Sequence, residues 1–424
     1  MKNLNVYIEI LGKQTYVGHI TGKDYRDASF SYDKEYMNSE YGAPISVALP
    51  LREEPFSPTE TKNFFEGLLP EGFSRKAVAN WLKADEQDYL MIIGKLGTEC
   101  LGAIMVTEGE PESAPHYEKL TSARVKELAA EGTTRSTKVL METHLSLTGA
   151  SGKVGLYYDE PNNEWYLPKG NAPSTHIVKQ SHVRLDRIVL NEQLCILAAG
   201  NVGIQVPHSF IINLGKAKDD EVLYATRRYD RKLPGGTHID GLVAPYRLHQ
   251  EDFAQAMSIS AADKYEIKPS GYLRKMFETV GRYTSNPMAD QRKLLEIIIF
   301  DYLVGNTDCH IKNCSLIYSE DLRSVRLAPA YDIVSTGVYN MTTDMSFYIG
   351  GEVNIKKITR ENFRIFAKEI GLSQKLVLKI FDDVANKFEA AVRDAADYLG
   401  QLGFKDASQM GEKILQSGGF GNVC

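Results

Sequence analysis

The sequence predicts an α+β fold with a small mixed domain first, a β-rich region next and a helical region last. Three observations support this prediction. Residues 6–10 and 15–19 alternate apolar and polar side chains, as half-buried strands do. Short strand-like runs bounded by Gly and Pro recur between residues 165 and 229, and helical spacing dominates from residue 285 onward. With 424 residues, the chain can bury the cores of two or three such domains.

Composition argues against two classes of partner. The net charge is −6, so we expect no general basic surface for nucleic acid, and any DNA contact would be local or supplied by a partner. No apolar run is long enough to span a bilayer, and residues 1–10 lack the apolar core of a signal peptide. We therefore expect a cytoplasmic protein without membrane contact.

The five cysteines favour reduced thiols over disulfides, because they are odd in number and scattered along the chain. Cys309, His310 and Cys314 lie close together in the sequence. No second ligand pair follows them, whereas structural zinc sites usually have four ligands. A zinc site is therefore not expected here.

Residues 1–108 are expected to form the small first domain. No group of titratable residues converges in this part of the sequence, so we assign the domain no chemistry of its own. Phe64 and Phe65 are interpreted as core residues. The expected elements, in chain order, are a hairpin over 6–10 and 15–19, a proline-bounded extended run over 44–51, helices over 63–70, 77–83 and 88–96, and a strand over 104–106.

Residues 109–138 are expected to link this domain to the remainder of the chain, residues 139–424. The stretch 108–115 is acidic and contains prolines, which is typical of linkers. A charged helix over 121–130 and a polar stretch over 131–138 follow.

Residues 146–156, SLTGASGKVGL, contain small residues that let backbone N–H groups turn toward an anion. The stretch is not a Walker A loop, since Leu147 takes the first glycine position and Val154 follows the lysine where Ser or Thr is needed. A β-hairpin turn is the competing interpretation, because Gly and Ser also mark ordinary turns.

Lys179 stands near the end of a strand-like run over 175–180, where a lysine can pair with nucleotide phosphates. An exposed lysine on a sheet edge is the alternative. A helix is expected over 193–199, with Glu192 at its start. Glu192 either holds Lys179 or is a solvated first-turn glutamate that the helix dipole favours.

The remaining elements follow from the same patterns. They are one strand over 205–207 and 210–213, a strand over 222–229, a helix that begins at Ser285-Asn286-Pro287 and ends at Gly305, a hairpin over 316–318 and 325–327, helices within 359–402, and a glycine-rich tail over 416–424 that is expected to fray.

The stretch from Asp301 to Asp332 gathers carboxylates, a carboxamide, a histidine and a lysine between apolar runs. Asp308 and Asn313 have the D-x-x-x-x-N spacing of kinase catalytic loops, and Asp332 follows an apolar segment as the metal-binding Asp of kinases does. Phosphoryl transfer needs such a set, because one Asp can orient the attacking hydroxyl while an Asn and a second Asp hold Mg²⁺ on the nucleotide phosphates.

These motifs together resemble those of the HipA-type serine/threonine kinases, the toxin components of bacterial toxin–antitoxin pairs. The resemblance extends over nearly the whole chain and rests on an ordered set of motifs. They are S-x-x-L-P-L at Ser46–Leu51, N-F-F-x-x-L-L-P at Asn63–Pro70, G-x-x-x-x-G-A at Gly97–Ala103, T-H-I-x-K at Thr175–Lys179, N-T-D-x-H-x-K-N at Asn306–Asn313 and L-A-P-x-Y-D at Leu327–Asp332.

The resemblance implies a protein-kinase-like, two-lobed catalytic domain behind a small α+β N-terminal subdomain. Its β-rich nucleotide lobe would span 139–245 and its helical lobe 246–424. ATP and Mg²⁺ are the implied ligands. Asp308 would be the base or hydroxyl-orienting residue, and Asn313 and Asp332 would hold Mg²⁺.

The resemblance also implies a nucleotide site built from several segments. Ser146 falls at the serine that is autophosphorylated in the family, and Glu192 would support Lys179. Arg227, in the hinge between the lobes, stands where the family has a glutamate. The residues assigned to ATP or its phosphates are Thr148, Gly149, Ala150, Ser151, Gly152, Lys153, Lys179, Arg227, Arg228, Tyr229, His310, Lys312 and Tyr331.

Partners are implied as well. HipA-type kinases pair with a small HipB-like helix-turn-helix antitoxin encoded beside them, and that complex contacts operator DNA. The protein substrates of the family include aminoacyl-tRNA synthetases, so an enzyme of that class is the implied target.

Two other functions remain open on sequence grounds. Asp308-x-His310 with Asp332 could ligate a metal that activates water, as in a metal-dependent phosphohydrolase, but Lys179 would then have no role. The chain could also be a catalytically silent component that acts through partner contacts. The presence of Asp308, Asn313 and Asp332 argues against that.

Overall fold

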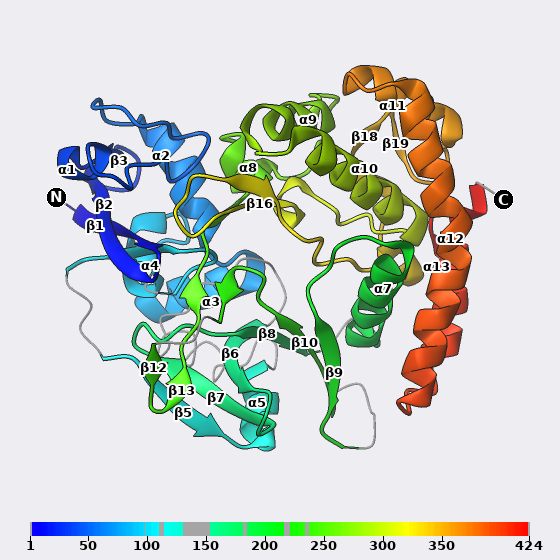
Figure 1. Ribbon diagram of the computed structural model, residues 1–424, viewed down its shortest axis with the longest axis horizontal. Helices are drawn as coiled ribbons and strands as arrows, with labels where there is room; N and C mark the ends of the chain where they lie inside the picture. Colours follow the sequence, from blue (N-terminus) through cyan, green and yellow to red (C-terminus); the bar gives the residue numbers. More distant parts are fainter. Residues whose placement is uncertain are drawn as a thin grey trace.

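The structure is a computed structural model that describes residues 2–97, 99–109, 114–129, 153–180, 185–215, 221–233 and 237–422. Its parts are an N-terminal domain, drawn in blue in Figure 1, a lobe built on a six-stranded sheet, and a helical lobe at the other side of the molecule. The α+β fold class predicted from the sequence is confirmed.

The N-terminal domain is built on four antiparallel strands, β1 (Lys2–Ile10), β2 (Lys13–Gly22), β3 (Ser29–Tyr32) and β4 (Ile104–Thr107). Their order in the sheet is β3-β2-β1-β4, and β1 and β2 form the predicted hairpin. Every second side chain of β1 from Leu4 to Ile10 is buried. The alternation read from the sequence therefore identified the core face of this sheet.

Short helices complete this domain. They are α1 (Lys34–Met37), α2 (Pro58–Phe65), the 3₁₀ turn η1 (Glu66–Leu68), α3 (Gly72–Leu82) and α4 (Tyr89–Leu96). The helix predicted over 63–70 begins earlier, because Ser57 and Glu60 form a capping box that starts it at Pro58. Phe64 and Phe65 are fully buried, which confirms them as core residues.

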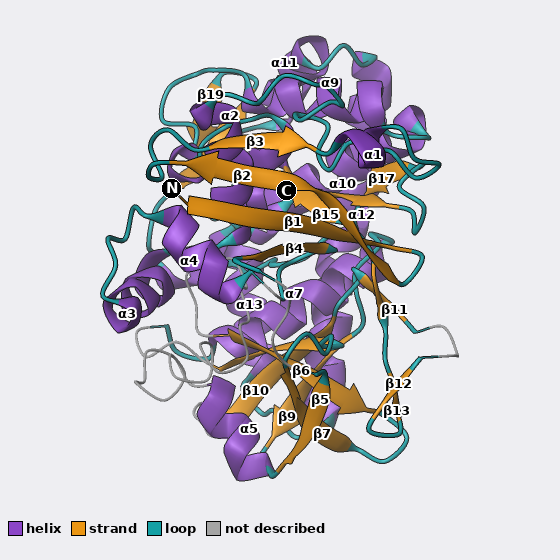
Figure 2. Ribbon diagram, turned by 90° about the vertical axis from the view of Figure 1, so that its left-hand side faces the viewer, coloured by secondary structure: helices purple, strands orange, loops and turns teal. Residues whose placement is uncertain are grey.

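The second lobe is a six-stranded antiparallel sheet. Its strands are β5 (His116–Leu120), β6 (Lys153–Asp159), β7 (Glu164–Lys169), β8 (His176–Gln180), β9 (Ser209–Asn213) and β10 (Val222–Arg227), in the order β5-β7-β6-β8-β10-β9. Figure 2 shows this sheet and the N-terminal sheet as separate layers. Helix α5 (Ser122–Ala129) shares a core with the sheet through Val125 and Leu128. Residues 116–129, expected in the linker, therefore belong to the sheet lobe.

Two boundaries in this lobe differ from the prediction. Helix α7 (Ile188–Val202) starts well before residue 193, so Glu192 lies beyond its first turn and is buried. Residues 205–207 are not part of a strand, and β9 begins at Ser209. Pro207 explains this difference, because proline lacks the N–H group that a sheet ladder needs.

Short strands lead from the sheet lobe toward the helical lobe. They are β11 (Arg231–Lys232), β12 (His238–Ile239), β13 (Leu242–Val243), β14 (Tyr246–Arg247) and β15 (Gln250–Asp252), after which α8 (Phe253–Ala256) follows. Strand β15 pairs with the predicted hairpin of β16 (Ser315–Tyr318) and β17 (Val325–Leu327). That hairpin is confirmed, and it supports the loops at both of its ends.

The helical lobe surrounds one buried helix, α10 (Pro287–Val304), which Asn286 caps as predicted. The other elements are η3 (Ala261–Asp263), α9 (Tyr272–Tyr283), η4 (Ile311–Asn313), η5 (Thr336–Tyr339), β18 (Asp344–Ile349), β19 (Glu352–Asn354), α11 (Arg360–Glu369), α12 (Gln374–Gln401), α13 (Ala407–Ser417) and η6 (Gly419–Asn422). Helix α12 packs against α7 of the sheet lobe as well as against α10, α11 and α13, so it joins the two lobes (Figure 1). Among the helices of the described residues, none has both the length and the apolar character needed to cross a membrane.

The tail from residue 416 to residue 422 is ordered, so the expectation that it frays is wrong for these residues. Asn422 Nδ2 donates to the carbonyl oxygen of Ile355 at 2.9 Å. A Cβ at Gly418 would collide with the carbonyl oxygen of Leu303, near the end of α10. The glycines that suggested fraying instead allow the tail to pack closely under the loop that follows α10.

This close approach gives a test of the tail packing. We expect Gly418→Ala to lower the free energy of unfolding by about 1–3 kcal/mol, because the added methyl group has no room beside Leu303. Gly421→Ala is the matched control, since a Cβ there would meet nothing within 4 Å. Urea denaturation of both variants would measure the difference, and equal stability would show that the tail does not pack there.

Candidate active site

A cleft of about 760 Å³ lies between the sheet lobe and the helical lobe. Strands β8 and β10 and helix α7 form one wall, and the loops after α10 and β17 form the other. The predicted site residues that line the cleft are Lys153, Lys179, Glu192, Arg227, Arg228, Tyr229, Asp308, His310, Lys312, Asn313, Tyr331 and Asp332. Ser146 and residues Thr148, Gly149, Ala150, Ser151 and Gly152 lie outside the described residues.

Lys179 is the centre of this cleft. It lies on β8, it is 8% exposed, and its Nζ contacts Glu192 Oε1 at 2.7 Å and Asp332 Oδ1 at 2.5 Å. The two carboxylates come from α7 and from the loop after β17. The structure therefore supports the first interpretation of Glu192, as the partner of Lys179, and excludes the solvated first-turn glutamate.

These contacts fix the charge states of Lys179 and Asp332. Burial alone would lower the pKa of Lys179, but Asp332 and Glu192 raise it above its ordinary value. Burial would likewise raise the pKa of Asp332, but Lys179, followed by Lys153, holds it well below its usual range. Burial raises the pKa of Glu192, and Lys179 opposes that shift. The charged Lys179 and the ionised Asp332 therefore form an ion pair in the cleft.

Asp332 is held in an unusual backbone conformation by the residue before it. Its φ of 57° lies in the left-handed region, which costs a non-glycine residue about 1–2 kcal/mol. The Tyr331 hydroxyl anchors the turn, because it lies 2.7 Å from Ser315 Oγ and donates to the carbonyl oxygen of Lys312 at 2.9 Å. The Tyr331 ring also packs on Tyr229, with ring centroids 5.6 Å apart. Tyr331 therefore fixes the backbone that directs the Asp332 carboxylate toward Lys179.

Asp301, near the end of α10, stabilises the loop that carries Asp308 through hydrogen bonds. Asn306 Nδ2 donates to Asp301 Oδ1 at 2.9 Å, and the backbone N–H of Asp308 donates to Asn306 Oδ1 at 3.2 Å. Thr336 Oγ1 accepts from the backbone N–H of Thr307 at 2.8 Å. These bonds position the loop without using the Asp308 carboxylate.

Asp308 and Asn313 face the cleft from the two ends of this loop. Asn313 Nδ2 donates to the backbone carbonyl of Asp308 at 2.9 Å, so the first and last residues of the D-x-x-x-x-N motif contact each other across the turn η4. The Asp308 carboxylate accepts a hydrogen bond from the Tyr265 hydroxyl at 2.5 Å. Burial raises the pKa of Asp308, and the hydrogen bond from Tyr265 opposes that shift.

His310 and Lys312 support the loop from the side of the N-terminal domain. Lys312 Nζ contacts Asp252 Oδ2 at 2.5 Å and Glu71 Oε1 at 3.6 Å, and it is buried. Burial, followed by the charge of Lys264, lowers the pKa of His310 to about 3, so its imidazole is neutral. Lys312 lines the cleft, but its charge is already paired with carboxylates.

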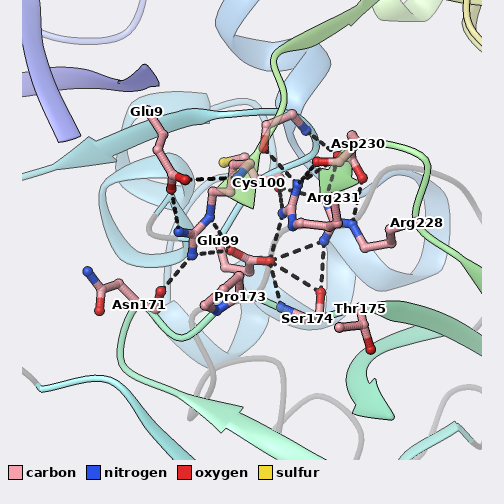
Figure 3. Close-up of polar contacts among 12 residues, drawn as sticks. Glu9, Glu99, Cys100, Asn171, Pro173, Ser174, Thr175, Arg228, Asp230 and Arg231 are labelled. Atoms are coloured by element: carbon pink, nitrogen blue, oxygen red, sulfur yellow. Dashed lines mark hydrogen bonds and ion pairs between the residues drawn. The ribbon is translucent and has the colours of Figure 1, made fainter. Parts of the chain in front are cut away.

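The hinge side chains of Arg227 and Arg228 differ in burial. The side chain of Arg228 is fully buried and turns away into a cluster of charges (Figure 3). It donates to Asp230 Oδ1 at 2.9 Å and to Asp230 Oδ2 at 2.7 Å, and it reaches Glu99 Oε1 at 3.2 Å. Arg227 is half-exposed and lies 4.0 Å from Glu160. The Arg228 side chain is thus held by carboxylates of the same chain, and the contact of this hinge residue with ATP stays a prediction.

The charged cluster joins the N-terminal domain to the hinge. Glu99 forms ion pairs with Arg231 Nη2 at 2.8 Å and with Arg247 Nη2 at 2.7 Å (Figure 3). Arg247 also forms an ion pair with Glu9 at 3.0 Å. Burial would raise the pKa of Glu99, but Arg247 and the other arginines hold it well below its ordinary value. The cluster pairs three arginines with three carboxylates, Glu9, Glu99 and Asp230. The N-terminal domain, to which we assigned no chemistry, therefore fixes the hinge.

Comparisons with known proteins agree with this architecture. The family model described as HipA-like C-terminal domain matches residues 145–392, more than half of the chain. The chain belongs to the HipA family. The model described as HipA N-terminal domain matches residues 8–107.

Several curated proteins are similar to this HipA-family chain. A protein of Sinorhizobium fredii named "Putative kinase Y4mE" is 30% identical over 394 residues, which cover 90% of each chain. The "Serine/threonine-protein kinase toxin HipA" of Shewanella oneidensis is 24% identical over 392 residues, which cover 89% of this chain and 86% of that protein.

A solved structure has the same fold. It is the complex of HipA, HipB and operator DNA from Shewanella oneidensis MR-1, and its similar chain matches with a TM-score of 0.78 and 21% identity over 98% of this chain and 96% of that one. The two-lobed, kinase-like α+β fold implied by the resemblance is confirmed.

Sequence reasoning missed several residues of this HipA-family site. Glu71 and Asp252 contact Lys312 in the loop of Asp308, and Glu99 fixes the hinge, but none of these three was among the predicted site residues. One signal was available. Glu99 interrupts an otherwise apolar stretch from Leu96 to Val106, and a charge in such a stretch needs a buried partner.

The cluster around Glu99 gives a second test. We expect Glu99→Gln to lower the free energy of unfolding by about 3–5 kcal/mol, because the buried Arg228 and Arg231 and the largely buried Arg247 then lose a shared carboxylate. Glu160→Gln, which removes an exposed carboxylate 4.0 Å from Arg227, should change stability little. Chemical denaturation would measure both, and similar values for the two variants would show that the cluster does not hold the domains together.

Asp301 gives a prediction about pH. Burial raises its pKa to about 7, and Asn306 opposes the shift, whereas an unfolded Asp has a pKa of about 3.9. Between these values the folded state binds more protons, so Asp301 makes the protein less stable as pH rises, by up to about 1.4 kcal/mol per pH unit. Asp301→Asn should remove this slope and narrow the difference in unfolding free energy between pH 5 and pH 7. Asp394→Asn, an exposed change on α12, should keep the wild-type slope.

Proposed function

We propose that this chain is an ATP- and Mg²⁺-dependent protein serine/threonine kinase. The observation that carries the proposal is the contact of Lys179 with Glu192 and Asp332 in the cleft that Asp308 also faces, although 153 positions separate Lys179 from Asp332. A charged lysine held by two carboxylates beside a separate, hydrogen-bonded aspartate is the arrangement that kinases use for phosphoryl transfer. The kinase names of the relatives support the same function.

Lys179 is suited to bind the phosphates of ATP. Its ammonium group is charged and held in place by Glu192, so it can contact phosphate oxygens without reorganising. Lys153, at the start of β6, adds a second amine to the same wall of the cleft. The loop from Thr148 to Lys153 would complete the phosphate site through its backbone N–H groups.

Asp308 is suited to orient the hydroxyl of the acceptor. In the proposed step, the acceptor oxygen attacks the γ-phosphorus, its bond to that phosphorus forms, and the bond from the γ-phosphorus to the β–γ bridging oxygen breaks. ADP leaves with that oxygen, and the proton of the hydroxyl passes to Asp308. Most of the catalysis comes from positioning and charge neutralisation, because a loose transition state needs little else.

The residues present fit Mg²⁺, which prefers oxygen donors and is usually held by one or two side chains together with substrate phosphates. Asp332 supplies an ionised carboxylate at the cleft. Asn313 uses its amide nitrogen on the loop backbone, which leaves its amide oxygen for a cation. When bound, Mg²⁺ neutralises the charge that develops on the phosphates.

We revise the roles of two of the predicted residues. Arg228 and Lys312 hold buried carboxylates, so we assign them to positioning rather than to phosphate binding. Tyr229 and Arg227 remain at the hinge wall of the cleft, where backbone groups can contact adenine.

We also propose the partners that the resemblance implies. The similar solved structure contains HipB and operator DNA, which supports a HipB-like antitoxin as partner and DNA contact through that complex. The net charge of −6 agrees with DNA binding through a partner rather than by this chain. An aminoacyl-tRNA synthetase is the proposed class of protein substrate.

The first test of the proposed function concerns Asp308. We expect Asp308→Asn to lower transfer of labelled γ-phosphate from Mg-ATP to protein by about 10²–10⁴-fold, because the amide cannot accept the proton of the acceptor. ATP affinity, measured by calorimetry, should stay at the wild-type value. Asp397→Asn, an exposed change on α12, should leave both quantities unchanged.

The same assay separates the other two functions. A phosphohydrolase would release phosphate without labelling protein, and a silent binding component would do neither. Full transfer by Asp308→Asn would contradict the role of Asp308.

A second test concerns Ser146. We expect mass spectrometry to find phosphate on Ser146 after incubation with Mg-ATP, and we expect the modified protein to be less active, because the charge would draw the phosphate loop out of the site. Ser146→Ala should keep its activity during the same incubation. An unmodified Ser146 after long incubation would contradict this part of the proposal.

A further inference from the structure

The carboxylate of Asp308 is already engaged with a hydroxyl group of the same chain. Tyr265 Oη donates to Asp308 Oδ1 at 2.5 Å, and both side chains line the cleft. In the proposed kinase reaction this carboxylate receives the hydroxyl of the acceptor. The phenol therefore already occupies Asp308 Oδ1, one of the two carboxylate oxygens that can receive an acceptor hydroxyl.

The surroundings of Tyr265 allow its side chain to leave while the backbone stays. Lys264 Nζ is paired with Glu71 at 2.6 Å, and Glu266 accepts hydrogen bonds from the backbone of Ser270 and Tyr348 at 2.6 and 3.0 Å. The loop is thus fixed on both sides of Tyr265.

The Tyr265 side chain itself is 41% exposed. Its described contacts besides Asp308 are an edge-on contact with the His310 ring at 5.1 Å and the Lys264 ammonium 5.4 Å from its ring centroid. These contacts are weak compared with a charge-assisted hydrogen bond. The bond to Asp308 is therefore the main one that a rotation of this side chain would break.

We propose that Tyr265 holds the acceptor position and that the serine or threonine hydroxyl of a protein substrate displaces its phenol from Asp308. The proposal rests on the proposed kinase function and adds to it the place where the acceptor side chain enters the cleft. The exposed Ile267, next to this loop, and Met341, which also lines the cleft, give the entrance an apolar edge for the residues that flank the acceptor.

The matched variant is Tyr265→Phe, which keeps the ring and removes only the hydroxyl. Tyr283→Phe is its control, because Tyr283 is similarly exposed at 37%, lies on α9 and is outside the cleft. The probes are two fluorescent peptides that differ only in a central serine or alanine. Their affinities are measured on the full chain with Mg²⁺ and a non-hydrolysable ATP analogue, so the measurement needs no turnover.

We expect Tyr265→Phe to bind the serine peptide about two- to tenfold more tightly than the wild type, because the serine no longer competes with an internal hydrogen bond. The alanine peptide should bind both proteins equally, and Tyr283→Phe should match the wild type with both peptides. An unchanged affinity for the serine peptide, or an equal gain for the alanine peptide, would overturn the proposal. Phosphate found on Tyr265 after incubation with ATP would also overturn it, since a group that is displaced is not consumed.

If the serine peptide binds as described but the wild type transfers no phosphate, the kinase proposal fails, whereas the displacement of Tyr265 by a serine hydroxyl is still observed. If the wild type transfers phosphate but Tyr265→Phe binds the serine peptide no more tightly than the wild type does, the kinase proposal stands and this one fails.

Discussion

A buried ammonium group stays charged only when carboxylates compensate for the water that it has lost. Lys179 meets this condition through Glu192 and Asp332, which come from different lobes of the molecule. The position of α7 is therefore linked to the conformation of the loop after β17. The strained backbone at Asp332, the anchored Tyr331 and the contact of α12 with α7 all serve this one arrangement.

The charged residues in and around the site form three groups with different functions. Lys179, Asp332 and Asp308 are among the charged residues that line the open cleft. A second set, around Glu99, is closed to solvent and joins the N-terminal domain to the hinge. A third contact, from Lys312 to Asp252 and Glu71, joins the same domain to the loop of Asp308. Both walls of the cleft therefore depend on a domain that contributes few residues to it.

Much of the site could be predicted because its motifs are local. The D-x-x-x-x-N spacing, the residues Tyr331-Asp332 and Lys179 on a strand are short patterns with a chemical meaning, and the structure gathers them in one cleft. The pairing of Arg228 with Glu99, and that of Lys312 with Asp252 and Glu71, could not be predicted, because these carboxylates are far away in sequence and only packing brings them together. The tail was misjudged for a related reason, since Gly418 marks a close contact with α10 that local composition does not reveal.

The arginines of the hinge cluster have a consequence for dissecting this protein. Excising the first hundred or so residues would remove Glu9 and Glu99, so Arg247 would lose both of its carboxylate partners and Arg231 one of its two. The remaining part, produced alone, would then expose the surface that the N-terminal domain covers, with arginines that lack their counterions, and would be prone to aggregate. Fragment complementation is the natural way to study the halves, because each piece supplies the counterions that the other lacks.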